Sequence, residues 1–141
     1  MSLYSQRLVR LKKEIIEIAK RKKKKKFKKN QFIMINFING VTNKAEFIIN
    51  GLNITLYLGD SKKGFKHILE RHYCKGCSGE ITTMDILNIT DIIERGIKLA
   101  QVGVTNNKLI VYSKIKDNKT HKIVLKPITN DNFIVTMYSL G

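Results

Sequence analysis

The chain has 141 residues, 43% of them hydrophobic, which is enough for one domain with a buried core. Its formal net charge of +16, from 27 Lys and Arg against 11 Asp and Glu, disfavours a cationic partner and favours a polyanion such as RNA, or an anionic membrane surface. No apolar run approaches the roughly 20 residues that span a bilayer, and no signal peptide is recognisable, so we expect a soluble protein of the cytoplasm without a transmembrane segment.

The first predicted element is an amphipathic helix over Leu8–Ala19, where apolar residues recur at helical spacing. It continues into Lys20–Lys29, in which every residue except one is cationic. Like charges repel along a helix, so this segment is expected to be frayed or disordered unless an anion neutralises it. We therefore distinguish a basic helical segment, residues 1–30, from an α+β unit, residues 31–141, within one domain overall.

Three β-rich apolar segments follow, with the sequences QFIMINFI, AEFIIN and ITLYL. They are separated by Asn-Gly pairs at positions 39–40 and 50–51. Asn-Gly tolerates the positive φ angles of tight hairpins, so these segments are predicted to be strands joined by turns.

Two helices are predicted in the middle of the chain. The first contains the stretch GFKHILERH, with Asp60 or Ser61 as its N-cap. The second runs from about Thr83 to Arg95, with Thr82 or Thr83 as the cap and Gly96 as the stop.

The C-terminal segment alternates well enough to form three strands, separated by KDNK and TNDN. The predicted fold is therefore α+β: an N-terminal basic helix, an antiparallel sheet that ends in a β-meander, and two central helices packed on one face. The other face of the sheet is left for a ligand.

Two of the three histidines lie on the first central helix, at positions 67 and 72. At about 100° per residue, His72 falls on the apolar face that begins at Phe65, whereas His67 points about 200° away from Phe65. The two histidines are then about 140° apart, unlike the i, i+4 zinc pair at about 40°, so a shared metal is disfavoured. The basic face around His67 consists of Lys63, Lys66 and Arg71.

The helix positions suggest different protonation states for the two imidazoles. His72 lies at the helix C-terminus, where the dipole favours the imidazolium form, so it is predicted to be a general acid. Neighbouring cations favour neutral His67, which suits a general base. The alternative is that His72 is an ordinary core histidine and His67 an exposed one.

Cys74 and Cys77 are predicted to be unpaired thiols in a loop without chemistry, because closing so small a ring constrains the unfolded chain little. A zinc site formed by His72, Cys74 and Cys77 is a less favoured alternative, since a single CxxC lacks the second ligand pair. No metal or other cofactor is expected.

The stretch GFKHILERH, followed by a helix, a β-meander and IVTMYSL, resembles the phage-associated nucleases of the barnase, EndoU, colicin and RelE-like (PBECR-type) superfamily. In that group a short helix with the pattern G-[FY]-x-H-[IL]-x-x-[RK]-H precedes an antiparallel sheet. The resemblance spans roughly Leu56 to Leu140. It implies a metal-independent endoribonuclease of toxin or phage type, with RNA as substrate and an immunity or antitoxin protein as a candidate partner.

Carried over by position, the resemblance implies that the catalytic residues are His67, His72, Thr136 and Tyr138. Alternation on the terminal strand puts Ile134 on the same face as Thr136 and Tyr138, with Phe133, Val135 and Met137 on the core side. On the middle strand, His121 is expected to face the core. The residues expected to bind nucleic acid are Lys22, Lys23, Lys24, Lys25, Lys26, Lys63, Lys66, Arg71, Lys122 and Lys126.

Two other classes of function fit the same charge. One is a non-catalytic basic protein that binds nucleic acid, and the other is a protein attached by its lysine run to an anionic membrane. The relative positions of the four candidate catalytic residues distinguish enzyme from binder. The sequence leaves the oligomeric state open.

Overall fold

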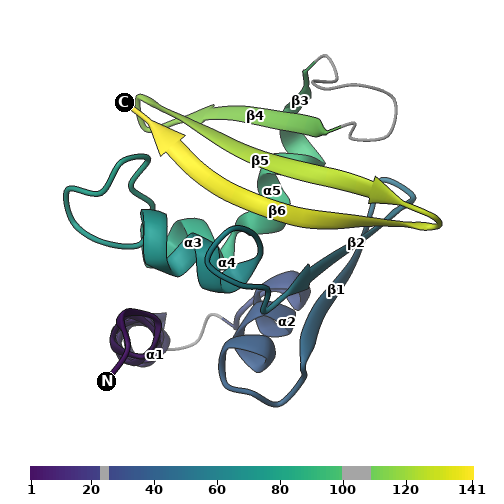
Figure 1. Cartoon of the computed structure of the whole chain (residues 1–141). Helices are drawn as coiled ribbons and strands as arrows, with labels where there is room; N and C mark the ends of the chain where they lie inside the picture. Colours follow the sequence, from purple (N-terminus) through teal and green to yellow (C-terminus); the bar gives the residue numbers. More distant parts are fainter. Residues whose placement is uncertain (23–25, 100–108) are drawn as a thin grey trace.

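The structure, a computed structural model, describes residues 1–22, 26–99 and 109–141. Its class is α+β, as predicted (Figure 1). The helices are α1 (Leu3–Lys22), α2 (Lys29–Ile38), α3 (Phe65–His72), α4 (Thr83–Leu87) and α5 (Ile89–Arg95). The strands are β1 (Lys44–Ile49), β2 (Leu52–Tyr57), β3 (Ile97–Lys98), β4 (Ile110–Lys116), β5 (Lys119–Ile128) and β6 (Asp131–Leu140).

The strands form one sheet in the order β1-β2-β6-β5-β4-β3. All neighbours pair antiparallel except β2 and β6, which run parallel, so the expected wholly antiparallel sheet is corrected to a mixed one. This parallel seam consists of two residue pairs, Ile54 with Asn132 and Thr55 with Phe133. Beside it, the Thr55 hydroxyl donates to the Asp131 carboxylate at 2.8 Å.

Three of the four predicted turns between strands are confirmed. Asn50 and Gly51 have φ angles of 52° and 80°, which allow a tight turn between β1 and β2. Asp117 and Asn118 have φ angles of 54° and 62° and connect β4 to β5, and Asn130 at φ 62° lies in the turn between β5 and β6. Asn and Asp tolerate this left-handed conformation better than other non-glycine residues, so local sequence determined these turns.

The prediction of a strand at QFIMINFI is wrong, because this segment lies in helix α2. Its buried residues, Gln31, Met34, Phe37 and Ile38, follow a helical spacing. The β-branched composition that favoured a strand is outweighed by packing of this face against β1. The following Asn-Gly pair ends the helix instead of turning a hairpin, with Asn39 as C-cap and Gly40 at φ 77°.

The central helices also differ in their ends from the sequence prediction. Helix α3 begins after Gly64, whose φ of 89° and close backbone neighbours leave little room for a side chain, so neither Asp60 nor Ser61 is the N-cap. The helix predicted from Thr83 to Arg95 is divided into α4 and α5 at Asn88. Its predicted cap is confirmed, since the Thr82 hydroxyl accepts from the backbone N–H of Asp85.

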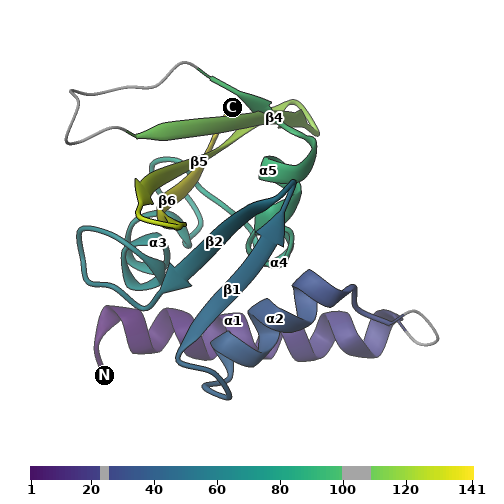
Figure 2. The ribbon, with the colours of Figure 1, turned by 90° about the vertical axis from the view of Figure 1, so that its right-hand side faces the viewer.

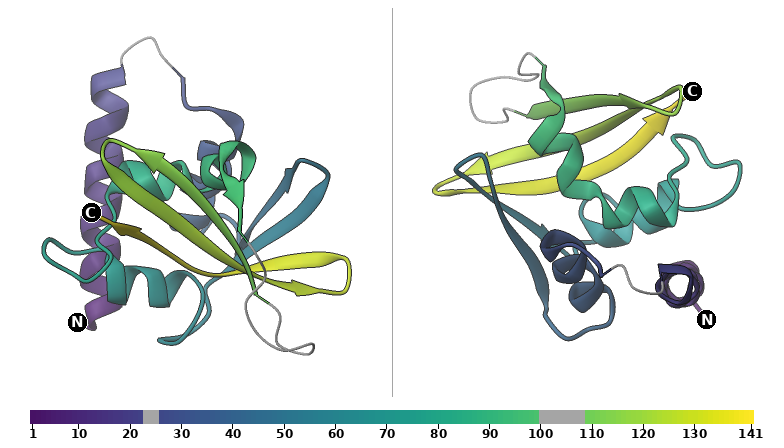
Figure 3. Two further views of the ribbon diagram at one scale, coloured as in Figure 1. Left: turned by 90° about the horizontal axis from the view of Figure 1, so that it is seen from above. Right: turned by 180° about the vertical axis from the view of Figure 1, so that it is seen from behind.

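Helices α2 and α5 cover the same face of the sheet, as seen from behind in Figure 3. The core between them and the strands consists mainly of Ile, Leu, Phe and Met side chains. Helix α3 instead lies along the edge of β6, below the strands in Figure 1. No helix of the described residues has both the length and the apolar character needed to cross a membrane.

Helix α1 runs along one side of the domain and contacts α3 near its start (Figure 2). The Arg7 guanidinium donates to the carbonyl oxygens of Leu69 and Glu70, which are free at the end of α3. Further along, the Glu14 carboxylate accepts a hydrogen bond from the hydroxyl of the fully buried Tyr73 at 3.0 Å. The basic helix is therefore attached to the helix that carries the histidines.

This attachment predicts that α1 contributes to the stability of the domain. Leu11 is fully buried, so Leu11→Ala should lower the free energy of unfolding by about 2–4 kcal/mol. Ile16 lies on the same helix with 55% of its surface exposed, and Ile16→Ala should change stability by less than about 0.5 kcal/mol. Urea denaturation of both variants measures the difference, and equal effects would show that α1 does not pack as described.

Candidate active site

Helix α3 buries the face that its sequence predicts, with Phe65, Ile68 and Leu69 almost inaccessible to solvent. His67 is half-buried, and so is His72, which was expected on the apolar face. The two imidazoles meet edge to face, with ring centroids 5.5 Å apart. This contact is possible because α3 ends at His72, where the side chain is no longer enclosed by a following helical turn.

Strand β6 contains one more residue than the segment of β5 with which it pairs. Thr136 pairs with Val124 and Ile134 pairs with Leu125, so Val135 is a β-bulge without a partner on β5. The bulge changes which side chains alternate together: Ile134 and Met137 are both buried, whereas Thr136 and Tyr138 lie on the opposite, half-buried face.

The predicted alternation is therefore wrong for Ile134, which lies in the core, and for Phe133, which contacts Tyr57 at a centroid distance of 4.9 Å. It is right for Thr136, Tyr138 and Met137. A strict period of two holds on each side of the bulge but not across it.

His67 lies between a backbone carbonyl and a hydroxyl. Its Nδ1 is 3.0 Å from the Ser61 carbonyl oxygen and its Nε2 is 3.0 Å from Thr136 Oγ1. A carbonyl can only accept, so the proton of neutral His67 is on Nδ1. Nε2 then carries the lone pair and accepts a hydrogen bond from the Thr136 hydroxyl.

The Ser61 carbonyl is presented by a short loop that closes on itself. Asp60 Oδ1 accepts from the backbone N–H groups of Lys62 and Lys63, at 2.8 and 3.1 Å, and the backbone N–H of Asp60 donates to the Lys63 carbonyl. The Gly64 N–H donates to the carbonyl of the bulge residue Val135 at 2.9 Å, which joins this loop to β6. The backbone hydrogen bond from Lys62 is the main cause that holds the pKa of Asp60 below its ordinary value.

His72 is oriented in the same way as His67. Its Nδ1 lies 2.7 Å from the Ser78 carbonyl, so Nδ1 carries the proton and Nε2 is available as an acceptor. The ring lies beside that of Tyr138, at a centroid distance of 5.8 Å. Gly79 fits against both residues, since a Cβ there would lie 2.9 Å from Tyr138 Cβ and 3.0 Å from His72 Nδ1.

The pKa of His72 is shifted in the direction opposite to the sequence prediction. Burial lowers this pKa below 6.5, the hydrogen bond to Ser78 opposes the shift, and the positive charges of His67 and Arg71 add to it. The helix-dipole argument expected an imidazolium, but α3 is only eight residues long and removal of the ring from water outweighs its dipole. His72 is therefore the imidazole that favours the neutral state.

The basic residues predicted to bind nucleic acid fall into two groups, one on and around α3 and the sheet and the other in the lysine run. Lys63, Lys66 and Arg71 lie on or next to α3, and Lys122 pairs directly with Tyr138 across β5 and β6. Lys126 lies beyond the bulge, opposite Phe133.

The described part of the lysine run is remote from the histidines, at the end of α1 away from α3 (Figure 2). At 1.5 Å per residue, Lys22 lies about 22 Å along the helix from Arg7. Lys22 is placed over the Phe27 ring at 5.1 Å and Lys26 is exposed. Lys23, Lys24 and Lys25 lie outside the described residues.

The prediction of unpaired thiols is wrong, because Cys74 and Cys77 form a disulfide. A turn closed by the hydrogen bond from the Cys77 N–H to the Cys74 carbonyl, with Gly76 at φ 84°, brings the two sulfurs together. The disulfide leaves no thiolate for the alternative zinc site, and His72 Nδ1 is hydrogen-bonded to the Ser78 carbonyl. Within residues 1–22, 26–99 and 109–141, no three His, Cys, Asp or Glu side chains are grouped to hold a metal ion.

The structure brings together four residues from two segments: His67 and His72 from α3, and Thr136 and Tyr138 from β6. His121 lies apart from them, as predicted, and is buried with its Nδ1 2.6 Å from Ser139 Oγ. Sequence reasoning missed the contributions of Ser61 and Ser78, because they act through backbone carbonyls that any residue could supply. The two glycines of GDSKKG indicated a loop, but not its contact with His67.

The chain matches no model of a known protein family, and comparison with curated proteins finds no match. The argument for function therefore depends on the geometry of these side chains.

The lowered pKa of His72 can be measured directly by NMR titration of its ring protons, and we expect a value below 6.5. The native state then binds this proton less readily than the unfolded chain, so the free energy of unfolding should rise with pH between the native pKa of His72 and about 6.5. His72→Gln should remove this part of the slope. A native pKa above the unfolded value would contradict the described burial of the ring.

Proposed function

We propose that the protein is a metal-independent endoribonuclease that cleaves RNA by transferring a 2′-hydroxyl onto the adjacent phosphate. The observation that carries this proposal is the contact between His67 and His72. Their ring centroids are 5.5 Å apart, and a backbone carbonyl orients each ring through Nδ1, so that Nε2 is the reactive nitrogen in both. Two oriented imidazoles are a sufficient acid and base for this reaction.

The electrostatics of the pair support an assignment of roles. Burial lowers the pKa of His72 and favours its neutral form, and the charge of His67 adds to this shift. Neutral His72 then acts as general base and protonated His67 as general acid. This reverses the roles that sequence position suggested, because burial of His72 outweighs the helix dipole.

In the proposed reaction, His72 Nε2 takes the proton of the 2′-hydroxyl while the oxygen attacks phosphorus. The bond from phosphorus to the 5′-oxygen breaks, and His67 Nε2 gives its proton to that leaving oxygen. The products are a 2′,3′-cyclic phosphate and a 5′-hydroxyl. Thr136, held at 3.0 Å from His67 Nε2, and Lys122, opposite Tyr138, are positioned to stabilise charge on the phosphorane oxygens.

A non-catalytic nucleic-acid-binding protein is the second candidate, and the position of the lysine run favours it. The run lies at the far end of α1 from the histidines, so backbone binding there would not require the pair at all. The net charge of +16 supports RNA binding under either proposal.

The nuclease proposal predicts that the purified protein cleaves single-stranded RNA in the presence of EDTA and leaves 2′,3′-cyclic phosphate ends. Mass spectrometry of the products identifies these ends. Cleavage that depends strictly on an added divalent ion, or products with 5′-phosphates, would be inconsistent with histidine acid–base chemistry.

The histidine variants separate catalysis from folding. His67→Ala should keep the fold and lower single-turnover cleavage by a factor on the order of 10² to 10⁴, the range expected for loss of an acid or base. His72→Ala should lower cleavage similarly and also lower the melting temperature, because the Ser78 carbonyl loses its donor and Tyr138 loses a ring contact.

The two variants, purified identically, also control for contaminating ribonuclease. If His67→Ala cleaves as fast as the parent while its melting temperature is unchanged, the activity does not come from this pair and the binding protein is the better proposal.

A further inference from the structure

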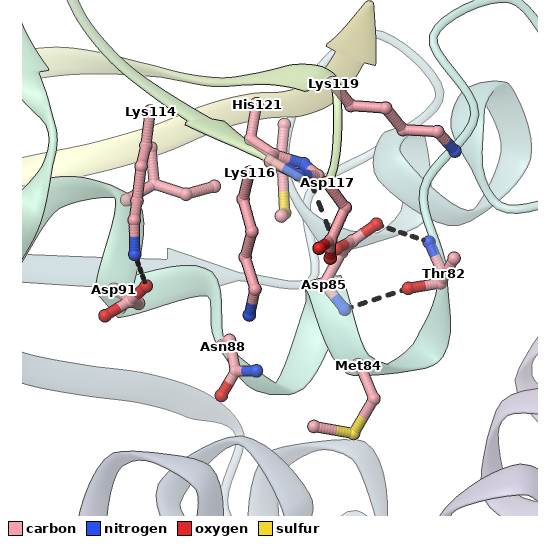
Figure 4. A pocket seen from close by; sticks show the side chains of 12 residues that line it. Thr82, Met84, Asp85, Asn88, Asp91, Lys114, Lys116, Asp117, Lys119 and His121 are labelled. Carbon is pink, nitrogen blue, oxygen red and sulfur yellow. Dashed lines mark hydrogen bonds and ion pairs between the residues drawn. The ribbon is translucent and has the colours of Figure 1, made fainter. Parts of the chain in front are cut away.

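A second feature of the fold lies on the side of β6 away from the histidine pair. It is a cavity of about 180 Å³ between the α4–α5 junction and the turn that joins β4 to β5 (Figure 4). At about 30 Å³ for each water molecule, it has the space of roughly six waters, which suits one heterocyclic ring. Its apolar lining comes from Met84, Ile92 and Met137.

One polar donor is fixed toward this cavity by two part-buried hydrogen bonds. Gln31 is 6% exposed and accepts a hydrogen bond from the Lys28 N–H at 2.8 Å through Oε1, so its amide nitrogen faces the other way. That nitrogen donates to Asn88 Oδ1 at 2.8 Å. The NH₂ group of Asn88, a cavity-lining residue, is thereby fixed as a donor that is not used in this contact.

The charged side chains that line the cavity are three lysines and three carboxylates: Lys114, Lys116, Lys119, Asp85, Asp91 and Asp117. Lys114 pairs with Asp91, and although burial raises the pKa of Asp91, the hydrogen bond and charge of Lys114 outweigh it and keep the carboxylate ionised. The Asp85 carboxylate accepts from the Thr82 N–H and lies 3.9 Å from His121 Nδ1.

The remaining charged lining residues are Lys116, Lys119 and Asp117, at the turn. Within the described parts of the chain, neither lysine forms a salt bridge, so their ammonium groups are the lining cations available to an anionic ligand.

We propose that this cavity binds one nucleotide of a single-stranded RNA, with the base on the methionine and isoleucine surface, its polar edge at Asn88, and its phosphodiester at Lys116 and Lys119. A flat, uncharged heterocycle with polar edges fits an apolar surface with one amide donor. The lysines lie at the turn, and Figure 4 shows the Lys116 side chain directed into the cavity and the Lys119 side chain directed to the side where Thr82 lies.

The two sites lie on opposite faces of β6, at neighbouring positions along the strand. Tyr138 faces His72, and the next residue, Ser139, faces His121 on the cavity side. The loop after α3 connects them, since Ser78 bonds to His72 and Thr82 lines the cavity. The inference rests on the proposed RNA substrate, and it adds a binding subsite for a nucleotide near the cleaved bond.

The test uses deoxydinucleoside monophosphates, which have a phosphodiester and two bases but no 2′-hydroxyl and so cannot be cleaved. Titration into the ¹⁵N-labelled protein should shift the side-chain NH₂ resonances of Asn88 in a saturable manner, for at least one base. Lys116→Ala together with Lys119→Ala should raise the Kd at least about fivefold, as expected for loss of a charged hydrogen bond. Lys12→Ala together with Lys13→Ala, on α1 before the lysine run, is a control with the same change of charge and should leave the Kd within about twofold.

Inorganic phosphate is titrated separately. If it shifts the Asn88 resonances as strongly as the dinucleotides do, the cavity binds an anion without a base and the inference fails. It also fails if no dinucleotide shifts these resonances.

Binding and cleavage give separable outcomes. Saturable dinucleotide binding in the cavity of a protein that does not cleave RNA would retain the subsite and reject the nuclease. Cleavage without these shifts would do the opposite.

Discussion

Val135 has no partner on β5, and the arrangement of the histidine site depends on this single unpaired residue. By adding one residue to β6, it directs Thr136 and Tyr138 toward α3 while Ile134 and Met137 both remain in the core. Its carbonyl also accepts the Gly64 N–H at the start of α3. Without the bulge, the strand could fill the core or meet the histidines, but not both, because side chains alternate strictly along a regular strand.

The two imidazoles are oriented by neutral carbonyls, whereas many catalytic histidines are oriented by a carboxylate that stabilises the imidazolium. Ser61 and Ser78 fix the rings and their tautomers without adding negative charge. In a protein with a net charge of +16, the surrounding cations attract an anionic substrate. The pKa of His72 is lowered mainly by burial, and the charges of His67 and Arg71 add to this shift.

Local sequence was sufficient for the features that depend on a few neighbouring residues. The buried face of α3, the Asn-Gly hairpin and the Thr82 cap could all be predicted, because each depends on periodicity or on one residue's conformational preference. The helix at positions 31–38 could not, since its β-branched residues become helical through packing on β1.

The β-bulge at Val135 could not be predicted either, because nothing in the sequence FIVTMYSL distinguishes the extra residue from its neighbours. The disulfide was rejected on grounds of loop entropy, but the turn at Gly76 already brings the cysteines together. Thus the four residues of the candidate site could be named from sequence as a hypothesis, whereas the contacts of the histidines with Ser61 and Ser78 depend on tertiary structure.

The parallel seam between β2 and β6 bears on how the molecule folds. Two residue pairs join segments that are 76 residues apart at Thr55 and Asp131, and the entropy cost of closing a loop grows only as the logarithm of its length, about 0.6 kcal/mol for each doubling. The length of the loop therefore adds little to the free-energy cost of forming the seam. Its contacts are long-range, however, so the seam is among the slow steps of folding. His67 and Thr136 meet just beyond it, so the α3 helix and the β5–β6 hairpin can each form early, before the site between them is assembled.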